Sequence, residues 1–148
     1  MKLLVALTAL VLPISALSAS VAGGEKLTIA GISPGDTLGN ITAMHGRPIS
    51  QERSDGFIVL QVRYDRLSFD LDEDGIVANA ETANPKYCFN DWLCPGAPMS
   101  TVRSKLPGLT QPSSLGAPFV AYADGDGCWL EITALAQNVT SLAFKCQP

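Results

Sequence analysis

The sequence predicts an α+β fold of two tandem units, each a short helix followed by an antiparallel β-meander. Three observations support this prediction. The chain that remains after removal of an export signal has the length of one domain. A pattern of a turn followed by a helix occurs twice in it, and alternating strand patterns follow each occurrence. The sequence leaves open whether the two meanders stand apart or share one larger antiparallel sheet.

Residues 1–22 have the pattern of a secretory signal peptide. Lys2 precedes the apolar run from Leu3 to Leu12, which is about half of the roughly 20 residues that a membrane-spanning helix needs. The small residues of Ser20-Val21-Ala22 suit a cleavage site, and the segment has no cysteine to carry a bacterial lipid anchor. We therefore expect a periplasmic or secreted protein without stable membrane insertion.

The charge of the chain argues against nucleic acids and anionic membranes as partners. The net charge is −4 and becomes about −5 once Lys2 is removed. A mildly acidic protein lacks the basic surface that nucleic acids and anionic membranes require. A partner with a basic surface would suit this charge, and no cofactor is predicted.

The predicted helices lie in two similar segments, 31–48 and 93–110. Each begins with a Pro-Gly turn, at Pro34-Gly35 and Pro95-Gly96, and each ends at a Gly/Pro pair. Apolar residues recur at helical spacing in both, as Leu38, Ile41 and Met44 and as Met99, Val102 and Leu106. These similarities place the units at 23–87 and 88–148.

The predicted strands follow each helix. Residues 67–80 align without gaps to residues 130–143, and further strands are predicted at 57–64 and 119–122. Gly75 and Asn138 align with each other, and we expect both to adopt the left-handed backbone that a hairpin turn requires. Each unit therefore has about three predicted antiparallel strands.

The four cysteines all lie in the mature chain, which favours disulfides over metal ligation. Cys128 and Cys146 flank a predicted hairpin at equal distances from Gln137. Directly opposed residues of such a ladder are within disulfide reach. This pairing leaves Cys88 to bond with Cys94.

Trp129 falls on the polar face of the same predicted hairpin, opposite Lys145. One interpretation is packing under a loop or against that lysine. The other is an anchor for a partner, because binding hot spots are enriched in tryptophan, tyrosine and arginine.

Three further aromatic residues, Tyr87, Phe89 and Trp92, lie in or beside the loop that the Cys88–Cys94 bond would close. Such a loop could be a rigid binding surface or a plug between the two units. The sequence favours neither, so these residues are further candidates for a partner interface.

Residues 70–81, DLDEDGIVANAE, match a calcium-loop pattern. The weak alternative metal ligands are Asp70, Asp72, Asp74 and Glu81. A calcium-binding loop of this type needs a helix on each side, whereas the preceding residues have a strand pattern. The stretch is therefore predicted first as a hairpin turn with solvated acids.

Several motifs together resemble a known family. They are G-I-x-P-G-x-T at 31–37, a terminating G-R-P at 46–48, and Y-x-x-L-x-F-x-x-D-x-x-G-x-V from Tyr64. This combination resembles the repeat of the beta-lactamase inhibitory proteins and of the related SmpA/OmlA-type outer-membrane assembly lipoproteins. The resemblance implies tandem helix-plus-sheet units and a non-enzymatic protein that binds another protein.

An enzymatic role is not predicted. The single histidine, His45, lies at a helix end and is expected to be a cap or surface group, and no nucleophile motif accompanies it. We expect a monomeric, exported inhibitor or immunity-type protein that occludes a partner enzyme with its sheet face. The alternatives are an envelope structural or assembly factor, a calcium-binding module and a small hydrolase.

Overall fold

The structure is a computed structural model that describes residues 26–122 and 127–147, so the predicted signal peptide at 1–22 lies outside the described residues. The helices are α1 (Leu38–His45) and α2 (Met99–Lys105). The strands are β1 (Ser50–Arg53), β2 (Ile58–Tyr64), β3 (Leu67–Asp72), β4 (Val77–Thr82), β5 (Phe119–Tyr122), β6 (Cys128–Leu135) and β7 (Asn138–Cys146). Neither helix of this described part is long and apolar enough to cross a membrane.

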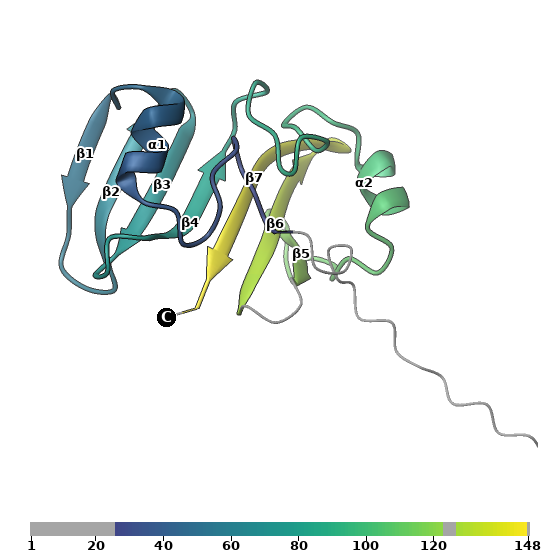
Figure 1. Ribbon diagram of the computed structural model, residues 1–148. Coiled ribbons are helices and arrows are strands. Elements are labelled where there is room, and N and C mark those ends of the chain that lie inside the picture. The colour runs from purple at the N-terminus through teal and green to yellow at the C-terminus, as the bar shows by residue number, and fades with distance from the viewer. Residues whose placement is uncertain (1–25, 123–126, 148) are drawn as a thin grey trace, which may run out of the picture.

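All seven strands form one antiparallel sheet in the order β1-β2-β3-β4-β7-β6-β5. The two halves of the sheet meet where β4 pairs with β7, with Ala80 opposite Phe144 and Asn79 opposite Lys145. Figure 1 shows the strands side by side, with the C-terminal strand β7 between β4 and β6.

The predicted fold class is therefore wrong. The structure is largely β, a single seven-stranded sheet with two short helices, and not two tandem helix-plus-meander units. The helices have 8 and 7 residues, about two turns each, which is too short for a helical layer. The β4–β7 ladder also joins all strands over one hydrophobic core.

Both helices begin at turns that are hydrogen-bonded to the start of a strand. Val77, the first residue of β4, accepts from the Gly35 amide at 2.9 Å and donates to the Asp36 carbonyl at 2.7 Å. Val139 in β7 makes the same two bonds with Gly96 and Ala97, at 2.7 and 2.9 Å. These bonds fix each helix beside a central strand.

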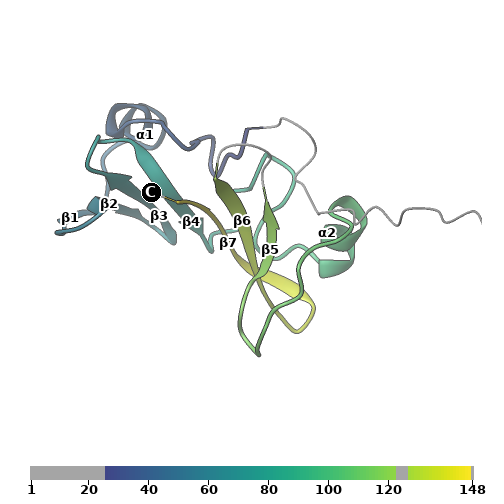
Figure 2. The same ribbon diagram turned by 90° about the horizontal axis from the view of Figure 1, so that it is seen from below.

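The core lies on the face of the sheet that the helices cover. Strand residues alternate between buried and partly exposed, as in the pattern of β3, because successive side chains of a strand point to opposite faces. Ile41 of α1 and Val102 of α2 belong to the same buried cluster as Phe69 and Phe144. In the rotated view of Figure 2, α1 lies above the strands β1 to β4.

The hairpin of β6 and β7 has the predicted register. Cys128 lies opposite Cys146, Leu130 opposite Phe144 and Ile132 opposite Leu142. The leucine, isoleucine and phenylalanine side chains are buried in the core. The residue alternation and the cysteine positions were therefore sufficient to predict this part of the sheet.

The turn residues were predicted correctly in one hairpin only. Gly75 has a φ of 76°, as expected. In the second hairpin the left-handed residues are Ala136 and Gln137, with φ of 49° and 70°, and not Asn138. The register shifts between Thr133 and Ala134, which makes Leu135 and Asn138 the last pair. The turn is therefore a two-residue loop.

Both predicted disulfides are present. Cys88 bonds with Cys94 across a sequence separation of 6, and Cys128 bonds with Cys146 across a separation of 18. Among the described residues no cysteine is free. Disulfides form and persist in oxidising compartments, so this is an exported protein.

The two edges of the sheet are protected in different ways. The outer strand β1 has the sequence SQER, and its last three residues are exposed. At the other edge, Val120 of β5 exchanges two backbone hydrogen bonds with Thr110, of 3.0 and 3.3 Å. A charged edge and an occupied edge both discourage pairing with another chain.

The disulfides should differ in their contribution to stability. In the chain-entropy model, the Cys128–Cys146 bond contributes about 3 kcal/mol and the shorter Cys88–Cys94 loop about 2 kcal/mol. We therefore expect the double variant Cys128→Ala/Cys146→Ala to lose about 1 kcal/mol more than Cys88→Ala/Cys94→Ala in urea unfolding. A larger loss from the Cys88 and Cys94 pair would contradict this ranking.

Candidate functional site

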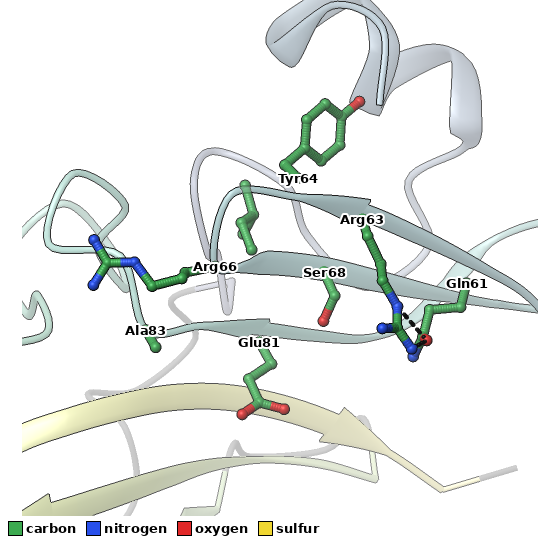
Figure 3. Close-up of a pocket in the computed structure, with 8 residues that line it drawn as sticks. Gln61, Arg63, Tyr64, Arg66, Ser68, Glu81 and Ala83 are labelled. Carbon is green, nitrogen blue, oxygen red and sulfur yellow. Dashed lines mark hydrogen bonds between the residues drawn. The ribbon is translucent and has the colours of Figure 1, made fainter. Parts of the chain in front are cut away.

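The face of the sheet that the helices leave uncovered is the candidate site, and we call it the open face. In Figure 3, Arg63, Ser68 and Glu81 project to one side of the sheet, whereas Tyr64 projects to the other side, toward α1. The register places further polar residues in one row across the open face, in the order Glu52, Gln61, Asp70, Asn79, Lys145 and Trp129.

Hydrogen bonds fix the polar side chains of β1 to β4. Glu52 pairs with Arg63 at 3.7 Å, and Arg63 donates to the Gln61 side-chain oxygen from Nε at 2.8 Å and also from Nη2. The Asp70 carboxylate accepts from Gln61 Nε2 at 2.8 Å and from Asn79 Nδ2 at 3.2 Å. These contacts therefore link the side chains to one another across four strands.

A second group of polar contacts lies on β6 and β7. The Glu131 carboxylate accepts from Trp129 Nε1 at 2.9 Å and pairs with Lys145 Nζ at 3.2 Å. Trp129 is partly buried on this face, beside Lys145 in the register, as predicted. The carboxylate holds the indole in place and leaves part of the ring exposed.

Two depressions lie on the open face, one beside the β2–β3 turn and one between β2, β3, β4 and β7, and we call them together the face groove. The larger has a volume of about 430 Å³ and is lined by Gln61, Arg63, Tyr64, Arg66, Leu67, Ser68, Glu81 and Ala83. The smaller, of about 100 Å³, is lined by Gln61, Ser68, Asp70, Asn79, Ala80, Glu81, Ala143 and Lys145. Both are lined by Gln61, Ser68 and Glu81, so the two depressions are neighbours.

The other aromatic candidates lie away from the open face. Phe89 is fully buried in the core, so its ring is not available to a partner. Trp92 packs edge-on against Phe89, and Lys105 Nζ lies 4.6 Å from the centre of its ring. Tyr87 packs against His45. Phe89 is therefore part of the core, and Tyr87 and Trp92 are packed against it.

The acids of the calcium-loop pattern do not meet at one point. Asp70 and Glu81 belong to the open face, on β3 and β4. Asp72 instead accepts from the backbone amides of Asp74 and Ile76, at 3.0 and 3.2 Å, and so closes the β3–β4 turn. Within residues 26–122 and 127–147, no group of three or more acidic, histidine or cysteine side chains could hold a metal ion.

A helix cap or surface group was expected at His45, but the side chain is half-buried in a group of aromatic rings. It lies near Tyr64, Phe69 and Tyr87, with ring centres 5.4 to 5.9 Å from its own. Its Nε2–H donates to the Ala30 carbonyl at 3.0 Å. Burial lowers the pKa of His45, and the hydrogen bond to Ala30 opposes this shift only in part.

Most of the polar side chains in the face groove were not identified as site residues from the sequence. Asp70 and Glu81 were considered as calcium ligands, although both lie in strands. The useful signal was the alternation in VANAET, where Asn79 and Glu81 occupy every second position of β4. Extended across β2 and β3, this period of two places Gln61, Arg63 and Ser68 on the same face.

Comparison with known proteins identifies the fold alone. No family model and no curated protein matches the chain. An extracellular protein containing an SCP domain, from Bacillus anthracis str. Ames, is similar in structure, with a TM-score of 0.61 and 16% identity. The match covers 97% of this chain and 50% of that one, so the chain spans about half its length.

A DUF4309 family protein from Bacillus subtilis subsp. subtilis str. 168 also matches. Its TM-score is 0.46 at 12% identity, over 76% of this chain and 79% of that one.

Calcium should not stabilise the protein. A ligand that binds only the native state must raise the melting temperature, and the acids of residues 70–81 do not converge on one point. We expect the same melting temperature with and without millimolar calcium chloride, with magnesium chloride as the ionic-strength control. A rise that is specific to calcium and is lost in Asp72→Asn would contradict this expectation.

His45 should make stability depend on pH. Its pKa is lowered in the folded state from the ordinary value of 6.5, so the unfolded chain binds more protons below that pH. The free energy of unfolding should therefore fall as pH decreases below about 6.5.

The control for this pH dependence is His45→Gln, which keeps an N–H donor for the Ala30 carbonyl. Urea unfolding between pH 7.5 and 5.5 should show a smaller loss of stability in this variant than in the wild type. An equal loss in both proteins would show that His45 is not responsible.

Proposed function

We propose that this exported protein is not an enzyme and acts by binding another protein through its open face. The most concrete form of the proposal is an inhibitor or immunity-type protein that covers the active site of a partner enzyme. The observation that supports it best is the row of hydrogen-bonded polar side chains beside Trp129 on an uncovered sheet.

The size of the open face suits a protein partner. Strands lie about 4.8 Å apart and rise about 3.3 Å per residue, so seven strands of about six residues cover roughly 30 by 20 Å. A standard protein–protein interface buries about 800 Å² on each partner. The open face therefore has approximately the area of one side of such an interface.

The contacts among side chains on the open face also support the proposal of a binding surface. Side chains that are already held in one conformation lose less entropy when a partner docks. Asp70, Gln61 and Arg63 are held by one another, and Trp129 is held by Glu131. Tryptophan is enriched among binding hot spots, so Trp129 is the proposed anchor.

The position of His45 supports a non-enzymatic role. It is the only histidine of the chain, and its Nε2 atom is occupied by the Ala30 carbonyl. The ring lies among Tyr64, Phe69 and Tyr87, on the side of the sheet opposite the open face. It is therefore poorly placed to serve as a general base for a substrate on that face.

Two further considerations bear on the compartment and the type of partner. The structurally similar Bacillus anthracis protein is described as extracellular, which agrees with a periplasmic or secreted location. The sequence resemblance to beta-lactamase inhibitory proteins favours an enzyme as the partner. The related lipoproteins suggest an assembly factor instead, and the identity of the partner separates these two roles.

Site-specific crosslinking tests the proposal. A photo-crosslinking amino acid at Ser141, which lies on the open face opposite Thr133, should capture a protein from the exported fraction of the source organism. The same group at Ser104, exposed on α2, should not. Mass spectrometry then shows whether the partner is an enzyme or an assembly component.

The anchor can be tested on the captured partner. Trp129→Ala should weaken binding by about 2 kcal/mol, a typical hot-spot value, or about thirtyfold in Kd. The control is Leu135→Ala, which removes an exposed apolar side chain at the β6–β7 turn.

Equal crosslinking from Ser141 and Ser104, or none from Ser141, would contradict the proposed function.

A further inference from the structure

The basic residues of the open face are already paired with acids. Arg63 pairs with Glu52 at 3.7 Å and also donates to the Gln61 side chain. Lys145 pairs with Glu131 at 3.2 Å. Each of these two cations is therefore already engaged with another acid.

Two acids of the face groove have no cationic partner in the described part of the chain. Asp70 accepts hydrogen bonds only from the neutral amides of Gln61 and Asn79. The Glu81 residue is exposed, and its side chain makes no hydrogen bond or ion pair with any described residue. Arg63, Arg66 and Lys145 also line the groove, but each is paired with another acid, so Asp70 and Glu81 are the two groove carboxylates without an ion pair among the described residues.

The groove has space beside the Glu81 carboxylate. In the register, Glu81 lies between Ser68 on β3 and Ala143 on β7, which both have small side chains. Figure 3 shows Glu81 extending from the same side of the sheet as Ser68. The one cation at the end of the groove, Arg66, lies on the β2–β3 turn 4.0 Å from Asp65.

We propose that the face groove receives a basic side chain, arginine or lysine, from the partner protein. The inference rests on the proposed function, since it names the chemistry by which the same face recognises its partner. A cation next to Glu81 and Asp70 would supply the missing opposite charge. An arginine could bond both oxygens of the Glu81 carboxylate and also contact Ser68.

The charge pattern also argues against a second copy of the chain as the occupant. A symmetric dimer with its two-fold axis through the groove would place the acids of one groove against those of the other. Like charges brought together across an interface cost several kcal/mol. A partner with a basic loop is favoured instead.

A titration with small probes tests the groove directly. We would add Nα-acetyl-arginine amide to ¹⁵N-labelled protein and follow the backbone amide resonances. Saturable shifts are expected at Ser68, Glu81 and Ala143 at millimolar probe concentration. Nα-acetyl-citrulline amide, which has the same shape without the charge, should leave these resonances unchanged. Equal shifts with both probes, or none at these residues with arginine, would overturn the inference.

A charge reversal provides the matched variant. Glu81→Lys places a cation in the groove and should abolish the arginine shifts. Glu73→Lys, which makes the same charge change at an exposed turn residue outside the groove, should preserve them. Because neither side chain has a described partner, both variants should fold. Arginine shifts that persist in Glu81→Lys would overturn the inference.

The crosslink from Ser141 distinguishes the two proposals. If both hold, Glu81→Lys should reduce the crosslinked product at least tenfold, whereas Glu73→Lys should not. If the product persists in Glu81→Lys, the open face binds a protein, but the inference about a basic side chain is wrong. If the wild type gives no product, the proposed function fails whatever the titration shows.

Discussion

The hydrogen-bonded ladder between β4 and β7 is the constraint on which the rest of the structure depends. It aligns residues 79–82 with residues 142–145 and so converts two groups of strands into one sheet. In this register Ala80 and Phe144 face the core, whereas Asn79 and Lys145 face outward. A slip of one residue would exchange the two faces. The core and the face groove, which both extend across this ladder, therefore depend on the same pairing.

The sequence was most informative where contacts are local. The β6–β7 hairpin and its disulfide could be predicted, because Cys128, Leu130 and Ile132 alternate within one short stretch. Both helices could be predicted from the turns and the apolar spacing within their own segments. The β4–β7 pairing could not be predicted, since it joins distant segments and no residue type marks the match. The left-handed turn residue was also misplaced at Asn138, because a register shift near Thr133 moves the turn back by one residue.

The open face combines two kinds of acid. Glu52 and Glu131 each pair with a cation of the protein, and Glu131 also accepts a hydrogen bond from Trp129. Asp70 accepts hydrogen bonds from neutral amides, and Glu81 is exposed to solvent. An acid already paired with a lysine or arginine offers little to a visiting cation, so only the second kind can discriminate between partners. The two kinds of acid look alike in the sequence, because the difference lies in cross-strand geometry.

The protected edges of the sheet have a consequence for how the protein behaves at high concentration. An exposed edge strand can template the addition of further strands and so start fibril growth. Here β1 presents charged side chains, and β5 is already bonded to Thr110. Polymerisation through the edges is therefore disfavoured, although the open face stays accessible. The protein can keep a large exposed sheet surface and still resist conversion into cross-β aggregates.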